Sequence, residues 1–265
     1  MRYTFKDTKM AREISRIISG VILFAAIFLS AFFIYKDEVV RFLNPEIAEA
    51  IPSSAVYPEK KKNPLPDSVD IAVPFSSQAP LGYWNQPWQD ACEEASVMMA
   101  VAWARGFTLT PDLAAAEILN EVDFENRVFG YHNDTDVDDT LRLFTEFYRY
   151  GNVALKKEGV SAENIKRELA SGNIVIVPLA GEILARENPY FTSPPHYHMV
   201  VIRGYDDKAQ KFIVNEPGTK QGEAFRYSYA TLIEAVHDWT GSASTILSGE
   251  KAMIVVMPPL PAYRR

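Results

Sequence analysis

The sequence predicts an α+β protein in which helices come first along the chain and strands later. Segments with helical spacing of apolar residues lie within 91–172, and segments of strand composition lie within 174–257. This order is typical of helices packed on an antiparallel sheet. The chain has 265 residues, of which 48% are hydrophobic, so a globular domain can bury a substantial core.

Four helices and four strands are expected in order. The second helix opens at Thr110-Pro111-Asp112, which places a cap, a first-turn proline and an acid at the positive end of the dipole. Gly106 ends the first helix. The predicted helices are 91–104, 110–122, 136–150 and 161–172, and the predicted strands are 174–179, 199–205, 211–215 and 252–257.

Charge and cysteine content exclude several classes of protein. The chain has 27 Lys and Arg against 34 Asp and Glu, a net charge of -7, and no aromatic-interleaved basic stripe. We therefore expect no nucleic-acid partner. The single cysteine excludes an internal disulfide and any multi-cysteine zinc or iron–sulfur site.

The N-terminal region predicts a membrane anchor. Residues 1–16 carry five basic and two acidic side chains, and residues 17–35 carry no charge. As a helix, 17–35 would span most of a bilayer core of roughly 30 Å. We interpret it as one transmembrane helix in preference to a cleaved signal peptide or a buried core helix, because the apolar run exceeds a usual signal core. The basic flank predicts that the tail at 1–16 is cytoplasmic and that the chain after about residue 36 is extracytoplasmic.

A proline-rich spacer follows the predicted anchor. Five prolines lie between residues 44 and 66, together with a run of three lysines at 60–62. Proline fixes its own φ and disfavours helix at the preceding residue, so 36–66 is expected to be a semi-rigid stalk. The functional domain should then be 67–265, on the outer side of a prokaryotic cell envelope.

Cys92 is the first candidate for chemistry. It lies at the start of the predicted helix 91–104, where the helix dipole and free backbone N–H groups favour a thiolate and can accept an oxyanion. The alternative is a small buried hydrophobic residue. Glu93 and Glu94 follow directly, and adjacent carboxylates disfavour a thiolate.

Two histidines begin the strand at 199–205. Period-two alternation places His196 and His198 on one face, and the turn at 206–209 returns Asn215 and Glu216 to the same end. Asn215 and Glu216 point to opposite faces, so only one of them can orient His198. Without a bulge, a loop of even length selects Asn215, whereas an odd loop selects Glu216. The alternative interpretation is a pair of edge-strand histidines bonded to backbone carbonyls, or an adventitious metal site.

No metal or other cofactor is predicted. Two histidines in a His–x–His pattern and one acidic residue do not complete the coordination sphere of a zinc ion, and no HExxH motif is present. The aspartates of HNDTDVDDT (132–140) are spaced somewhat like a calcium loop, but they lack its glycine and its terminal glutamate. We expect these aspartates to cap the helix at 136–150.

Four segments in order carry a family resemblance. They are VPFSSQ (73–78), QDACEEAS (89–96), HYHMVVIRGYDD (196–207) and FIVNEPG (212–218). This combination resembles the papain-like cysteine peptidases of family 39, the bacteriocin-leader peptidases and their stand-alone C39-like relatives, over about residues 71–260. The resemblance implies a papain-like fold, with a helical first half packed on an antiparallel sheet.

The resemblance also implies roles for individual residues. Cys92 would be the nucleophile and His198 its general base, with Asn215 or Glu216 orienting the imidazole. Gln78 would donate its side-chain amide to the oxyanion hole. Gln86, six residues before the cysteine, is the rival for that role, and Gln89 is a weaker third choice.

Two positions depart from the family pattern. Its frequent Gly-Pro after the cysteine is Glu93-Glu94 here, and its usual Asp before Pro217 is Glu216.

The most consistent function is a membrane-anchored extracytoplasmic thiol hydrolase acting on a peptide or protein. Trp84 and Trp88, with His196, are candidate substrate-binding residues because they flank the predicted site. Two alternatives stay open. One is a binding module on the same fold that holds a peptide or glycan, and the other is a peptidoglycan amidase or transpeptidase.

Overall fold

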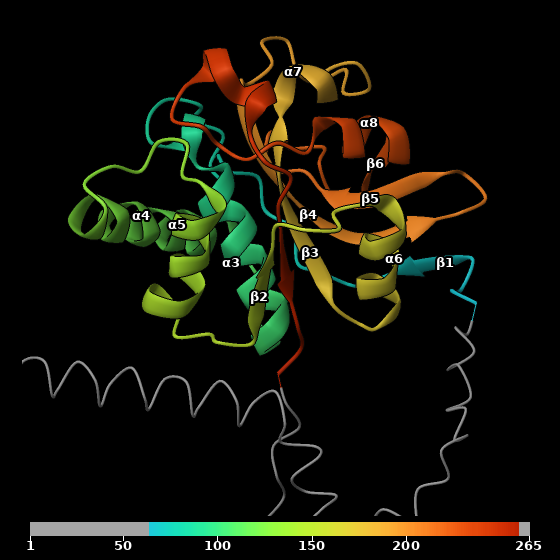
Figure 1. Ribbon diagram of the computed structural model, residues 1–265. Coiled ribbons are helices and arrows are strands. Elements are labelled where there is room, and N and C mark those ends of the chain that lie inside the picture. The colour runs from blue at the N-terminus through green and yellow to red at the C-terminus, as the bar shows by residue number, and fades with distance from the viewer. Residues whose placement is uncertain (1–63, 260–265) are drawn as a thin grey trace, which may run out of the picture. The chain divides into compact units, whose positions relative to one another are not determined.

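The computed structural model of the chain describes residues 64–259 (Figure 1). The predicted tail at 1–16, the predicted membrane helix at 17–35 and residues 36–63 of the predicted stalk lie outside the described residues. Within 64–259, no helix has the length and apolar character needed to cross a membrane.

The core of the domain is an antiparallel sheet. Its order is β2-β7-β3-β4-β5-β6, and β1 pairs with the far end of β4. The strands are β1 (Ser68–Asp70), β2 (Val153–Lys156), β3 (Ile174–Ala180), β4 (Tyr197–Asp206), β5 (Lys211–Asn215), β6 (Phe225–Ser228) and β7 (Met253–Val256). The expected α+β class and the four predicted strands are confirmed. The structure adds β1, β2 and β6, which are short and partly exposed and so lack a strong apolar pattern.

The four predicted helices begin within one residue of their predicted starts, and the structure adds two short helices. The four are α3 (Cys92–Arg105), α4 (Pro111–Val128), α5 (Val137–Arg142) and α6 (Ala162–Ala170), and the two added helices are α7 (Gly181–Leu184) and α8 (Tyr229–Ala235). Short 3₁₀ turns occupy Trp88–Asp90 and Ala243–Ser248. The Thr110 and Ser161 hydroxyls accept the N–H groups of Leu113 and Asn164, and Gly106 closes α3 with a φ of 73°.

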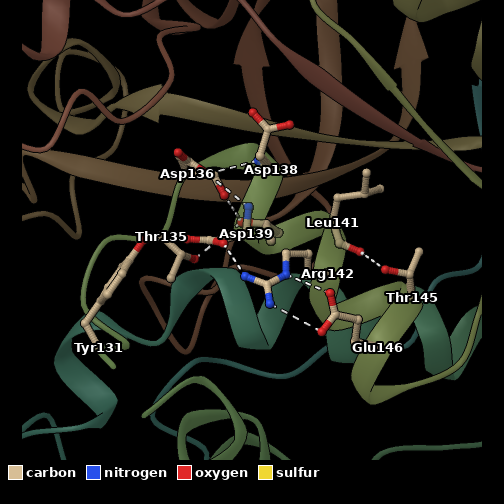
Figure 2. A network of polar contacts seen from close by, with 10 residues as sticks. Tyr131, Thr135, Asp136, Asp138, Asp139, Leu141, Arg142, Thr145 and Glu146 are labelled. Carbon is tan, nitrogen blue, oxygen red and sulfur yellow. Dashed lines mark hydrogen bonds and ion pairs between the residues drawn. The ribbon is translucent and has the colours of Figure 1, made fainter. Parts of the chain in front are cut away.

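The aspartate-rich segment caps a helix, as predicted (Figure 2). One Asp136 carboxylate oxygen accepts the backbone N–H groups of Asp138 and Asp139 at 3.0 and 2.9 Å. Arg142 then bridges Asp139 and Glu146 along the same helix. The predicted single helix over 136–150 is instead α5 followed by a π-helical turn at Leu143–Phe147.

Helices α3, α4 and α5 lie together beside the sheet, and α3 packs on β4 (Figure 1). Ser96 Oγ donates to the Met199 carbonyl oxygen at 3.3 Å, which ties the two elements together. Helix α4 runs six residues beyond the predicted end. Its last turns bury Glu121 and Glu125, and carboxyl groups on a buried face interrupt the apolar periodicity that marks a helix.

A bulge in β4 sets the register of the strands near its start. Asp206 pairs with Lys211 and Val201 pairs with Asn215, with the shift located between Ile202 and Gly204. The turn at 207–210 has an even length, which without a bulge would place Asn215 on the face of His198. The bulge adds one residue to β4, so Glu216 lies on that face instead. Gly204 is required there, since a Cβ at this position would lie 2.2 Å from the Val69 carbonyl oxygen of β1.

Replacement of Ile176 by Ala tests the packing of the sheet. Ile176 is fully buried in β3 and pairs with Val201 of β4 and Ile254 of β7. We expect Ile176→Ala to lower the free energy of unfolding in urea by about 2–5 kcal/mol, because it removes apolar contacts and leaves a cavity. Leu247→Ala, at a side chain 63% exposed, should change it by less than about 0.5 kcal/mol. Equal effects would show that β3 is not the centre of the core.

Candidate active site

A cavity of about 690 Å³ lies beside the first residues of α3 and β4. Segment 190–198 and loop 218–221 form much of its wall. The residues on this wall that the sequence singled out are Gln78, Trp84, Gln89, Cys92, His196 and His198. The structure therefore brings the predicted nucleophile and the predicted base, 106 positions apart in the chain, to one cavity.

Cys92 is the first residue of α3, as predicted. Its side chain is 3% exposed, and it follows Ala91, whose side chain makes no cap. The first N–H groups of a helix have no partner within the helix, so the N–H of Cys92 is suited to stabilise negative charge at the cavity. Sγ donates a hydrogen bond to Glu93 Oε2 at 3.1 Å.

Glu216 holds the imidazole of His198 through its Nε2 atom. The two side chains are buried, and His198 Nε2 contacts Glu216 Oε1. Glu216 also accepts the Tyr227 hydroxyl at 2.8 Å and the Gly218 N–H at 2.9 Å. Because Glu216 acts only as an acceptor here, Nε2 carries the proton and Nδ1 is the nitrogen left to act as a base.

The packing around this pair is tight. The ring of Phe191 meets the His198 ring edge to face, with centroids 5.5 Å apart. A Cβ added at Gly218 would lie 3.0 Å from Glu216 Oε1 and 3.1 Å from His198 Cε1. Gly218 is therefore needed for the close approach of its loop to the imidazole.

Asn215 lies on the opposite face and does not contact His198. Its Nδ2 donates to the carbonyl oxygens of Val73 and Pro74 at 3.1 and 3.2 Å, and Arg203 donates to its Oδ1 at 3.4 Å. The sequence left open whether Asn215 or Glu216 contacts the imidazole, and in the structure it is Glu216. Asn215 instead fixes the chain that leads to Gln78.

The three candidate glutamines lie in different settings. Gln78 is buried on the cavity wall, and its Nε2 donates to the carbonyl oxygens of Trp88 at 3.0 Å and Gln89 at 2.8 Å. Its Oε1 is buried without a hydrogen-bond partner among residues 64–259. Gln86 is exposed, contacts Asp90 and does not line the cavity. Gln89 lines the cavity but is exposed.

The predicted binding residues separate into two groups. Trp84 lines the cavity and is 41% exposed, and His196 lines it with its Nδ1 3.1 Å from Glu182 Oε1. Trp88 does not line the cavity. It packs against a small apolar cluster that includes Met98 and Ile118. Trp88 therefore supports the start of α3.

The thiol of Cys92 is neutral in this arrangement. Burial raises the pKa of Cys92 well above its ordinary value, and Glu93 in its ionised form raises it further. Burial likewise raises the pKa of Glu93, with Glu94 beside it as the next cause. The helix start alone led us to expect a thiolate. Burial and the following carboxyl groups oppose the dipole, so the resting group is a protonated thiol.

A set of buried carboxyl groups next to Cys92 was missed from the sequence. Glu94 of α3 and Glu125 of α4 are close enough to shift one another's pKa, and none of their four carboxyl oxygens has a hydrogen-bond partner among the described residues. Glu121 accepts the Tyr148 hydroxyl at 2.6 Å. The signal available in the sequence was the i, i+4 pair of glutamates alternating with Ile118 and Val122 on one face of α4.

These acids do not form a metal centre. Within 64–259, no group of three or more His, Cys, Asp or Glu side chains is arranged to hold a metal ion. Burial raises the pKa of Glu94, and it raises that of Glu125 to about 9. Burial therefore favours the neutral form of both carboxyl groups.

Comparison with known proteins gives a family match over much of the chain. The model of the Peptidase_C39 like family matches residues 71–244. The resemblance predicted from the sequence is confirmed. No curated protein matches the chain.

Two solved structures resemble the domain at low identity. A putative C39-like peptidase from Bacillus anthracis is 17% identical, with a TM-score of 0.47, and the match covers 74% of this chain and 100% of the other. Xylellain, a cysteine protease from Xylella fastidiosa, is 13% identical, with a TM-score of 0.45, and the match covers 74% and 88% of the two chains.

The protonated state of Glu125 predicts how stability depends on pH. Its folded-state pKa is raised from 4.5 to about 9, so its stabilising contribution is complete below the unfolded value and is lost as pH rises toward 9. We expect Glu125→Gln to flatten the fall in the free energy of unfolding between about pH 5 and about pH 9. Glu223→Gln, at an exposed carboxyl, should leave the curve unchanged. Parallel curves for the wild type and Glu125→Gln would show that Glu125 is ionised in the folded protein.

Proposed function

The chain belongs to the Peptidase_C39 like family, a family of cysteine peptidases, and we propose that it hydrolyses peptide bonds with Cys92, His198 and Glu216. Cys92 is the nucleophile, His198 the general base and Glu216 the group that orients His198. One observation carries the proposal. Cys92 and His198 line the same cavity, and the far nitrogen of His198 is bound to a buried carboxylate.

The proposed reaction begins from a neutral thiol. His198 Nδ1 takes the proton of Cys92 Sγ as the sulfur attacks the carbonyl carbon of the substrate. The N–H of Cys92 at the start of α3 stabilises the oxyanion. His198 then gives the proton to the leaving amine, and water hydrolyses the acyl-enzyme with His198 again acting as base.

Gln78 is the proposed second donor to the oxyanion. It lies on the cavity wall, and its backbone N–H donates to the Pro217 carbonyl oxygen at 2.9 Å, which ties it to the loop behind His198. Both N–H groups of its amide face backbone carbonyl oxygens. To serve the oxyanion, Nε2 must turn away from these two carbonyl oxygens and toward the cavity when substrate binds.

The substrate is a peptide or protein, as the family implies. Trp84 offers an exposed aromatic surface at the cavity, and Asp90, Asp134 and Lys220 supply charges of both signs. We further propose that the uncharged segment 17–35 anchors the chain and places this domain on the extracytoplasmic side, on the basis of the charge pattern of residues 1–35.

Alkylation of Cys92 by iodoacetamide tests the role of His198. The chain has one cysteine, so the rate reports this thiol alone. We expect His198→Ala to slow alkylation near neutral pH by about a hundredfold, in line with the loss of a general base. His132→Ala is the matched control, because His132 bonds to Asn126 away from the cavity wall. A rate indifferent to His198 would contradict the proposal and favour a binding module on the same fold.

Replacement of Glu216 by Gln tests the orientation of the imidazole. A glutamine can present its amide N–H to Nε2, which moves the proton to Nδ1 and removes the free base. We expect Glu216→Gln to slow alkylation of Cys92 by about tenfold or more. Glu182→Gln makes the same change at an exposed carboxyl and should have no such effect. If both variants react as the wild type does, Glu216 has no role in the reaction.

A further inference from the structure

Glu93 is hydrogen-bonded to the sulfur of Cys92 and has no role in the proposed reaction. Glu93 follows Cys92 in the chain, is fully buried, and has its Oε2 3.1 Å from Cys92 Sγ. Its other oxygen, Oε1, accepts the backbone N–H of Thr135 at 3.1 Å. Thr135 immediately precedes Asp136, the N-cap residue of α5 (Figure 2). Because the donor is a backbone N–H, Oε1 can act toward it only as an acceptor.

The surroundings of Glu93 favour its neutral form. The titratable groups that act on it are Cys92 and Glu94 of α3 and Asp134 of the segment before α5. Tyr197 of β4 and Glu125 of α4 complete this environment. All of these groups are acids. Burial is the largest cause that raises the pKa of Glu93, Glu94 and Asp134 raise it further, and the hydrogen bond from Cys92 lowers it. The net effect favours the neutral form of Glu93.

The position of that proton follows from the hydrogen bonds. A carboxylic acid has one O–H donor, and the oxygen that accepts a backbone N–H is best left as the carbonyl oxygen. Oε1 accepts from Thr135, which leaves Oε2 to carry the proton, and Oε2 faces the sulfur. A neutral carboxyl at this distance can accept from a thiol and can donate to a thiolate.

We propose, on the premise of the function above, that Glu93 is a further catalytic residue that donates a hydrogen bond from Oε2 to Cys92 Sγ as the sulfur becomes a thiolate. The proton of Sγ passes to His198 Nδ1, and the proton of Glu93 stays on Oε2 throughout. Glu93 thereby offsets part of the cost of forming a negative sulfur in a buried position. At alkaline pH Glu93 ionises, and the same contact then opposes the thiolate.

The test compares two replacements of similar size in the full chain. Glu93→Gln keeps an N–H donor for the sulfur and cannot ionise, whereas Glu93→Met keeps the length and loses the donor. The ultraviolet absorbance of the thiolate and the alkylation rate, each followed against pH, report the titration of the single cysteine. Glu121→Gln is the matched control, since Glu121 is equally buried and is not among the groups that shift the pKa of Cys92 or of Glu93.

We expect the thiol of Glu93→Met to titrate about one pH unit higher than that of Glu93→Gln, a tenfold loss of thiolate below its pKa. The wild type should match Glu93→Gln near neutral pH and fall below it at alkaline pH. Glu121→Gln should follow the wild type. Coincident profiles for Glu93→Gln and Glu93→Met would overturn the proposal. If Glu93→Met does not fold, coincidence of the wild type and Glu93→Gln at all pH values overturns it.

His198→Ala separates this inference from the proposed function. A titration that responds to His198 but not to Glu93 removes only the role of Glu93. A titration that responds to neither residue, or a cysteine that fails to react in every variant, removes both.

Discussion

One extra residue in β4 determines which side chain lies behind His198. The turn between β4 and β5 has an even length, which in a regular ladder would place Asn215 on the face of His198. The bulge next to Gly204 shifts the register by one residue and brings Glu216 to that face instead. Arg203 lies at the bulge and donates to Asp70 at 2.9 Å and to Asn215 at 3.4 Å, so the irregularity is held by side chains on both sides.

The electrostatics of the site favour a protonated nucleophile at rest. Helix α3 opens with Cys92 and continues with two buried glutamates, and burial raises the pKa of the thiol. A preformed thiolate and imidazolium pair would place more charge in an already acidic, poorly solvated region. In the proposed mechanism the thiol loses its proton only during attack, to a histidine whose tautomer Glu216 fixes, and this avoids that cost. The acidic groups around α3 therefore disfavour a thiolate at Cys92 before substrate is attacked.

Much of the fold and part of the site could be predicted from the sequence. The apolar runs of β3 and β4 and the capping residues Thr110 and Ser161 are local signals, and they gave the central strands and the helix starts. The candidates Cys92 and His198 came from a helix start, a strand start and a family pattern. The choice between Asn215 and Glu216 could not be made, because a bulge is a tertiary feature that depends on the packing of β1 against Gly204. The burial of Glu121 and Glu125 could not be predicted either, because glutamates in a sequence normally indicate solvent-exposed positions.

The most direct measurement of the central claim is cleavage of a diverse peptide pool by the purified full chain, with new peptide termini identified by mass spectrometry. The account predicts new termini with the wild-type protein and their disappearance in Cys92→Ser and in His198→Ala, with His132→Ala as active as the wild type. Cleavage that persists in Cys92→Ser, or a peptide pool that the wild-type protein leaves unchanged, would contradict the account.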